Sequence, residues 1–196
     1  YGKLADVWGR RPAYLLGASI FLLGSVACGL SPSMLWLIAA RGLQGIGAGA
    51  MIPVTLVAIG DMYPVAERVR VMSVFSLVWG LSSVIGPTAG GFLVALGWPW
   101  VFLVNVPIGG VALLAVALTM RDPPPVRGAR VDVAGALSCM LATSAVLLGA
   151  SELREGRYAR GAVALALGAA LGAWFLRVER RAPDPILPPA LLADRT

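Results

Sequence analysis

The arginine at position 41 has the setting that points most clearly to chemistry. Met34–Gly60 is an apolar stretch of 27 residues in which Arg41 is the single charge, and Gln44 follows three positions later. A charge inside a membrane-spanning helix costs about 2.5–3.5 kcal/mol on insertion scales, so it needs a polar partner or a wet cavity. Such residues mark substrate or ion pathways by default, and a purely structural arginine, hydrogen-bonded to a neighbouring helix, is the alternative. Arg41 and Gln44, which share one side of a helix, are therefore the first candidate site residues.

A second group of charges lies in the first twelve residues, YGKLADVWGRRP. Asp6 and Arg10 are four positions apart, so one helical turn would bring their side chains together. Gly2 and Gly9 would allow a tight turn and a close approach of the backbone. An ordinary basic loop explains the bare spacing about equally well.

Small residues recur at helical spacing in two apolar stretches. Gly42, Gly45 and Gly49 fall at positions i, i+3 and i+7 behind Arg41, and Gly45 and Gly49 form a GxxxG pair. The same spacing recurs at Gly86 and Gly90, with Pro87 and Gly91 beside them. GxxxG lets helix backbones approach closely, and an internal proline makes a helix bendable. These residues predict a packed, movable interface, although packing alone would explain them equally well.

The composition indicates that these residues belong to a membrane protein, because it excludes most classes of soluble protein. Hydrophobic residues make up 58% of the chain and charged residues 13%, with a mean hydropathy of +0.82. A soluble domain has about 25% charged residues. The net charge of +6 does not indicate nucleic-acid binding, because the basic residues lie between apolar blocks. The chain has no histidine, and its two cysteines lie in apolar stretches without metal-type spacing, so neither metal-dependent nor Ser/His catalysis is expected.

The apolar stretches predict six transmembrane helices and an all-α integral membrane fold. The predicted spans are 13–30, 34–60, two within 71–120 that are separated at Gly97–Trp100, 133–151 and 161–176. Their length and continuous hydrophobicity exclude the alternating strands of a membrane β-barrel. A charged loop is expected at 61–70, a Pro-rich connector at 121–132 and a polar segment at 177–196.

The basic residues predict the orientation of these spans. Twelve Lys and Arg residues lie on one side, in 1–12, 61–70, 121–132 and 177–196, whereas three lie on the other, at Arg154, Arg157 and Arg160. Cytoplasmic loops carry the excess of Lys and Arg. Tyr1 is therefore expected in the cytoplasm. The chain starts without Met and ends abruptly, so we expect it to be a fragment of a longer protein.

Four motifs together resemble those of the major facilitator superfamily, in particular its drug:proton antiporters. Residues 1–12 resemble the signature GxLaDrxGRRp between its second and third helices, with Val7 in place of a common Arg. RGLQGIGAG at 41–49 resembles RxxQGxGaG on the fourth helix, and residues 82–91 resemble gxxxGPxxGG on the fifth, with Ser82 in place of its first Gly. WPWVFLVNVPIG at 98–109 resembles the start of the sixth helix in the 14-span branch.

The resemblance implies roles for these residues. Arg41 and Gln44 would assist proton coupling, and Asp6, Arg10 and Asp61 would form a cytoplasmic charge relay. The glycines at 45, 49, 86, 90 and 91, with Pro87, would form the packing and antiporter motifs. None of the six apolar spans contains Asp or Glu, so the acidic partner of Arg41 is expected elsewhere.

The resemblance also implies an organisation and an activity. The spans would be helices 3 to 8 of 14, with 1–120 in the N-terminal six-helix bundle, 121–132 a cytoplasmic linker, 133–176 two extra helices and 177–196 a loop toward a missing C-terminal bundle. The expected function is proton-coupled efflux of small lipophilic or cationic molecules across the inner (plasma) membrane, without a cofactor or nucleic acid. A nutrient symporter or facilitator and a non-transporting sensor or scaffold remain alternatives. An enzyme is not expected.

Overall fold

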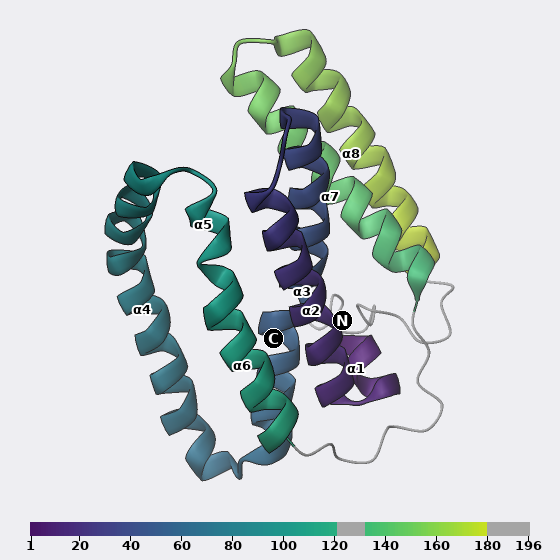
Figure 1. Cartoon of the computed structure of the whole chain (residues 1–196). Coiled ribbons are helices and arrows are strands. Elements are labelled where there is room, and N and C mark those ends of the chain that lie inside the picture. Colours follow the sequence, from purple (N-terminus) through teal and green to yellow (C-terminus); the bar gives the residue numbers. More distant parts are fainter. Residues whose placement is uncertain (121–131, 180–196) are drawn as a thin grey trace. The chain divides into compact units, whose positions relative to one another are not determined.

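The computed structural model describes residues 1–120 and 132–179, and the ordered elements there are helices (Figure 1). The chain divides into two compact units, residues 1–127 and 128–196, which are described separately. The first unit holds α1 (Gly2–Trp8), α2 (Arg10–Gly29), α3 (Met34–Met62), α4 (Val65–Leu96), α5 (Trp100–Leu103) and α6 (Asn105–Thr119). The second unit holds α7 (Val133–Arg154) and α8 (Tyr158–Glu179).

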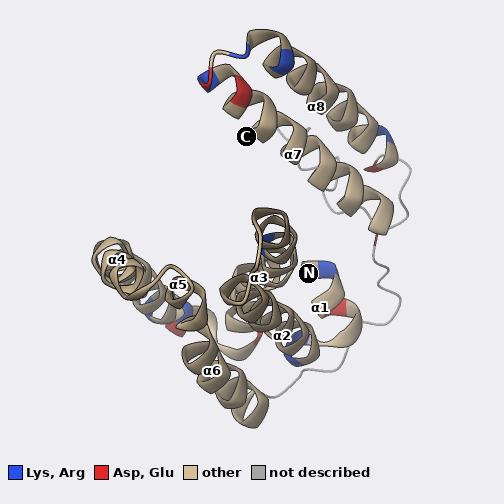
Figure 2. Cartoon of the chain, turned by 45° about the horizontal axis from the view of Figure 1, so that its top comes forward, with Lys and Arg blue, Asp and Glu red and all other residues tan. Residues whose placement is uncertain are grey.

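The prediction of six membrane-spanning helices is confirmed by length and hydropathy. Within the described residues, six helical segments of 20 to 32 residues are apolar enough to cross a bilayer, with α5 and α6 counting as one segment, Trp100–Thr119. A bilayer core of about 30 Å needs about 20 helical residues. Charged residues gather near the helix ends, while the central parts of the helices carry almost none (Figure 2). The fold is therefore all-α and of the membrane-spanning kind.

The predicted charged loop at 61–70 is wrong. Helix α3 continues through Met62 and α4 begins at Val65, so the break is confined to Tyr63 and Pro64. Pro64 occupies the position before the first helical residue of α4, where its missing amide hydrogen costs nothing. Glu67 lies in the first turn of α4, where a negative charge stabilises the positive end of the helix dipole.

The first twelve residues form helix rather than a loop. Gly9 separates α1 from α2 with a φ of 99°, in the left-handed region that favours glycine. Gly2 instead begins α1, and a Cβ there would meet nothing within 4 Å, so the turn predicted at Gly2 is wrong. The sharp turn at Gly9 places the side of α1 that carries Ala5 against the bundle, where Ala5 is fully buried.

Helices α2 and α3 pack backbone to backbone through glycines. A Cβ on Gly47 would lie 2.2 Å from the Phe21 amide nitrogen, and one on Gly24 would lie 2.6 Å from the Gln44 backbone. Among the described residues, Gly45 has nothing within 4 Å of a built Cβ and Gly49 meets only the Tyr1 ring at 3.9 Å, so a packing role for this stripe stays a prediction. The face of α3 that packs closely against α2 is the one that carries Gly47.

The GxxxG motif of α4 is not packed within the described part of the chain. Helix α4 has no buried residue, and a Cβ on Gly86, Gly90 or Gly91 would meet nothing within 4 Å. Pro87 lies inside the helix without ending it. A packing role for these residues stays a prediction.

The helix after Gly97 is interrupted near its start. Gly97 ends α4 with a φ of 133°, at the break predicted from Gly97–Trp100. Pro107 has no amide hydrogen for the Leu103 carbonyl four residues earlier, and its ring crowds that carbonyl. Accordingly α5 ends at Leu103 and α6 begins at Asn105, with Val104 as the junction.

The second unit is an antiparallel pair of helices with glycine-mediated contacts. A Cβ on Gly149 would lie 2.9 Å from the Leu165 amide nitrogen, and one on Gly168 would lie 3.1 Å from that of Val146. The Asp132 side chain caps α7 by accepting a hydrogen bond of 2.8 Å from the Gly135 amide. The predicted linker at 121–132 and the loop at 177–196 lie almost entirely outside the described residues.

The glycine contacts predict a selective effect on stability. Gly47→Ala should lower the melting temperature by several degrees, because overpacking against backbone costs about 1–3 kcal/mol and 1 kcal/mol corresponds to about 2–4 °C for a protein of 150–250 residues. Gly110→Ala in α6, which meets nothing within 4 Å, is the control and should change it little. Thermal unfolding followed by tryptophan fluorescence measures both. Equal melting temperatures for the two variants would contradict the packing described here.

Candidate functional site

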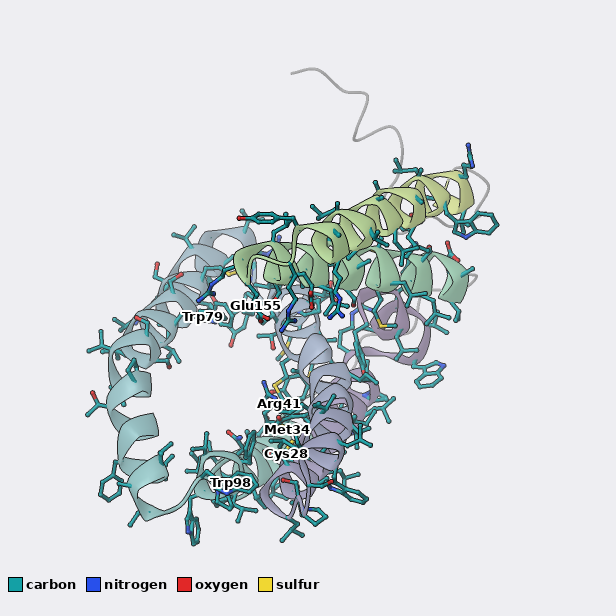
Figure 3. The ribbon with its side chains drawn as sticks, turned by 90° about the horizontal axis from the view of Figure 1, so that it is seen from above. Cys28, Met34, Arg41, Trp79, Trp98 and Glu155 are labelled. Atoms are coloured by element: carbon teal, nitrogen blue, oxygen red, sulfur yellow. The ribbon has the colours of Figure 1, made fainter. Side chains whose placement is uncertain are left out.

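Arg41 is held by one side chain of its own helix and one aromatic ring from α5. Its Nη1 donates a hydrogen bond of 2.6 Å to Gln44 Oε1, and its Cζ lies 5.7 Å from the centre of the Phe102 ring. A charge-assisted hydrogen bond contributes about 1.5–3 kcal/mol, and a cation over an aromatic face adds about 0.5–2 kcal/mol. Figure 3 shows Arg41 on the flank of α3 that is turned toward α4.

Gln44 connects Arg41 to the interface between α2 and α3. Its side chain is 2% exposed, and its Nε2 donates a hydrogen bond of 2.9 Å to Ser25 Oγ. The thiol of Cys28 lies 3.9 Å from Gln44 Oε1, as a weak second donor to that oxygen. Gly24 lets α2 approach the backbone of Gln44 closely enough for these contacts. The buried carboxamide thus has partners on both its oxygen and its nitrogen, as a buried amide requires.

The hydroxyl oxygen of Ser25 in α2 bonds to residues of three other helices. Its hydroxyl accepts from Gln44 Nε2 and, at 3.0 Å, from Asn105 Nδ2 on α6. It also donates a hydrogen bond of 2.8 Å to the Phe102 carbonyl of α5. Ser25 is fully buried. We call Ser25, Gln44, Arg41, Phe102 and Asn105 the Ser25–Gln44 network.

The Arg41 side chain does not extend toward the nearer end of α3. Arg41 is seven residues from Met34, or about 10 Å along a helix that rises 1.5 Å per residue. A lone arginine at this depth normally extends its head toward the interface. Here the guanidinium instead contacts Gln44, one turn deeper into the span. The structure records no ion pair for Arg41 within residues 1–120 and 132–179, so its recorded partners there are neutral.

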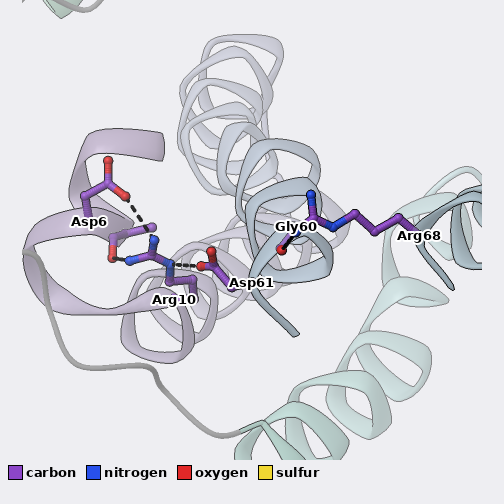
Figure 4. A network of polar contacts seen from close by, with 6 residues as sticks. Asp6, Arg10, Gly60, Asp61 and Arg68 are labelled. Atoms are coloured by element: carbon purple, nitrogen blue, oxygen red, sulfur yellow. Dashed lines mark hydrogen bonds and ion pairs between the residues drawn. The ribbon is translucent and has the colours of Figure 1, made fainter. Parts of the chain in front are cut away.

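A second polar cluster ties together the opposite ends of α1, α2 and α3. Arg10 Nε donates to Asp61 Oδ2 at 2.7 Å, and its Nη2 lies 3.3 Å from Asp6 Oδ1 (Figure 4). Arg10 Nη1 also donates to the Ala5 carbonyl at 3.2 Å, and the arginine side chain is 9% exposed. We call Asp6, Arg10 and Asp61 the Arg10 cluster. All three residues of the predicted charge relay therefore lie in contact.

Two further arginines secure the same helix ends. Arg68 of α4 donates to the Gly60 carbonyl (Figure 4) and, at 2.9 Å, to the Tyr63 carbonyl, both at the end of α3. These carbonyls have no donor within their own helix, and a cation stabilises the negative end of the helix dipole. The positive charge also offsets the unfavourable position of the Asp61 carboxylate at that end. Arg11 donates to the Ala117 carbonyl of α6 at 2.5 Å.

The sequence predicted some of these residues and missed others. Arg41 and Gln44 stand out because they are polar within an apolar stretch, and the structure brings them together. Ser25 was missed, because a serine inside an apolar helix usually bonds to its own backbone and has no distinctive spacing. Arg11 and Arg68 were seen only as loop charges, since their acceptors are backbone carbonyls that no sequence motif marks.

The geometry of the Arg10 cluster predicts that Asp61 contributes to stability. Asp61→Asn should destabilise the folded protein by about 1.5–3 kcal/mol, because a nearly buried guanidinium loses a charge-assisted hydrogen bond. Glu155→Gln is a matched control: Arg157 and Glu155 form a pair at 3.0 Å, but both side chains are more than half exposed. Exposed pairs contribute about 0–1 kcal/mol. Chemical or thermal unfolding measures the difference, and equal effects of the two variants would contradict the structural role of Asp61.

Comparison with known proteins identifies the family of this chain. Residues 1–179 match the family model of the Major Facilitator Superfamily. Multidrug transporter protein MdtP of Bacillus subtilis (strain 168) is 38% identical over 201 residues, which covers 100% of this chain and 37% of that protein. Multidrug resistance protein 3 of the same strain is 35% identical over 192 residues, covering 95% of this chain and 37% of that protein.

A mycobacterial relative gives the same result. Multidrug resistance protein Stp of Mycobacterium tuberculosis (strain CDC 1551 / Oshkosh) is 35% identical over 195 residues, covering 97% of this chain and 36% of that protein. The chain therefore spans little more than a third of the length of the curated relatives it matches. Because the family model covers nearly the whole chain, this protein belongs to the major facilitator superfamily.

Proposed function

We propose that this chain is part of a proton-coupled efflux antiporter for small lipophilic or cationic molecules. The observation that carries the proposal is Arg41, a charge held by neutral partners inside an apolar helix of a major facilitator protein. Three relatives whose names include multidrug transport or resistance support the substrate class. Transport would proceed by alternating access, with two bundles rocking about a site near the middle of the membrane.

In the proposed mechanism Arg41 supplies a fixed charge that responds to a titrating partner. An arginine keeps its proton throughout the accessible pH range, so the group that gains and loses a proton must be another one. A carboxylate outside the described residues would be attracted to Arg41 while ionised and released when protonated. In this mechanism Gln44 and Phe102 would hold Arg41 in both cases, since neither changes charge. The guanidinium would therefore stay in place while the partner moves, and no cofactor is needed beyond the proton gradient.

The Arg10 cluster would act as the conformational relay of this cycle. Its hydrogen bond and ion pairs join α1, α2 and α3 at one end of the bundle, and Arg68 joins α4 to the same end. Such contacts can break and re-form as helix ends separate, and they are weaker when water enters. The small residues Gly86, Pro87, Gly90 and Gly91 would then allow α4 to bend and slide against a neighbouring segment.

The same proposal includes the placement of the chain in the membrane. Tyr1 and the Arg10 cluster would face the cytoplasm, and the Met34 end of α3 would face outward, in the plasma membrane. Residues 1–120 would supply helices 3 to 6 of the N-terminal bundle, and 133–176 would supply the two extra helices of a 14-span protein. Residues 121–132 and 177–196 would be cytoplasmic connections.

The direction of transport separates this proposal from a nutrient symporter or facilitator. When the proton gradient is dissipated in cells, the substrate of an exporter accumulates inside, whereas that of a symporter falls. A sensor or scaffold would insert into the membrane without any substrate flux. A fall in internal substrate after the gradient is lost would overturn the export direction.

The role of Arg41 predicts a specific loss of transport. Arg41→Ala should reduce substrate transport driven by an imposed pH gradient by about 10- to 150-fold, the factor that corresponds to losing a charge-assisted hydrogen bond in the coupled state. Proteoliposomes that contain the protein provide the measurement.

Arg160→Ala is the matched control, because Arg160 lies exposed near the start of α8. This variant should transport at close to the original rate, and both variants should reach the membrane in equal amounts. Full-rate gradient-driven transport by Arg41→Ala would overturn the proposed coupling role.

A further inference from the structure

The hydroxyl of Ser25 uses its complete hydrogen-bonding capacity. A serine hydroxyl has one hydrogen to donate and two lone pairs that accept. The hydrogen goes to the Phe102 carbonyl, which cannot donate in return. Both lone pairs are occupied, one by Gln44 Nε2 and one by Asn105 Nδ2. Ser25 is fully buried, so no water can replace a lost partner without a rearrangement.

This arrangement determines which way the Gln44 carboxamide faces. Because the Ser25 hydrogen is committed to Phe102, the serine oxygen can only accept from Gln44. Gln44 must therefore present its amino group to α2, which leaves its carbonyl oxygen for Arg41. A guanidinium has donors and no acceptor, so it requires that oxygen. The opposite orientation of the carboxamide would place amino hydrogens against the hydrogens of Arg41.

The same hydroxyl also fixes the second partner of Arg41. Its hydrogen bond to the Phe102 carbonyl holds α5 against α2, close to the interruption at Val104. The ring of Phe102 lies beneath the Arg41 guanidinium. Ser25 thus positions the oxygen that binds Arg41 and the ring that lies against it, without touching Arg41.

We propose that Ser25 is a positioning residue for Arg41. Through Gln44 and Phe102, Ser25 aligns the Arg41 guanidinium for the coupling step. The predicted effect of Ser25 on transport rests on the proposed function. The structural part of the inference, the control of Arg41 by Ser25, can be tested without any transport. Asn105 of α6 donates to the same hydroxyl, so a movement of α6 would change the position of Arg41 through Ser25.

The structural test compares the chemical reactivity of Arg41 in three variants. Ser25→Ala removes the hydroxyl, and Gln44→Met removes the carboxamide at similar volume. Ser138→Ala is the matched control, because its buried hydroxyl donates to the Gly135 carbonyl of its own helix, at 2.9 Å. Modification of Arg41 by phenylglyoxal is followed by peptide mass spectrometry in the purified protein. Ser25→Ala and Gln44→Met should each speed the modification about threefold or more, and Ser138→Ala should leave it unchanged.

The functional test asks whether Ser25 acts through Gln44. Ser25→Ala should lower pH-gradient-driven transport about three- to tenfold, as expected for the loss of a neutral hydrogen bond. The pH midpoint of transport should move upward, because a loosened positive charge stabilises an ionised carboxylate partner less. In a Gln44→Met background Ser25→Ala should add little, since two residues of one pathway are not additive.

The outcomes separate the two proposals. If transport shows no proton dependence even in the original protein, the proposed function fails, while the phenylglyoxal result still decides the role of Ser25. Unchanged Arg41 reactivity in Ser25→Ala would overturn that role. A different result would overturn the positioning role and assign Ser25 a packing role instead. In that case the transport losses of Ser25→Ala and Gln44→Met would multiply in the double variant, and the pH midpoint of transport would not shift in Ser25→Ala.

Discussion

The hydrogen bond between Arg41 and Gln44 is the interaction on which the site depends. A guanidinium cannot lose its charge, so a helix that carries one through an apolar environment must provide partners at fixed positions. Gln44 provides an oxygen at 2.6 Å, and Phe102 provides an aromatic face. Both partners are neutral, which satisfies the guanidinium without cancelling its charge. The field of Arg41 therefore remains available to act on a titrating group.

The surrounding helices meet the requirements of this interaction. Gly24 and Gly47 remove the side chains that would hold α2 and α3 apart, so that Ser25 can reach Gln44. Pro107 interrupts the helix after Leu103, next to the Phe102 carbonyl that accepts from Ser25. At the opposite helix ends the Arg10 cluster holds α1, α2 and α3 together by charge. The bundle is thus joined by neutral hydrogen bonds around the buried Ser25 and by ion pairs at the opposite helix ends.

The sequence contained the spans and the charged residues but not the contacts between helices. Hydropathy and length are local properties, so the six spans and the break at Gly97 could be predicted. Arg41 and Gln44 were recognisable because polar groups in an apolar stretch need partners. Which glycine packs against α2 depends on where that helix lies, so the sequence could not show that Gly47 makes the contact. The same limit applies to Ser25, whose importance depends on residues 19, 77 and 80 positions away in the chain.

In the proposed mechanism Arg41 couples substrate movement to proton movement. The most direct measurement is the proton flux that a substrate gradient drives in proteoliposomes with a pH-sensitive dye inside and no imposed pH gradient. We expect substrate flow to drive protons in the opposite direction in the original protein. In Arg41→Ala this proton flux should vanish, even where slow substrate exchange persists. Proton flux in proportion to substrate flow in Arg41→Ala would contradict the proposed coupling role of Arg41.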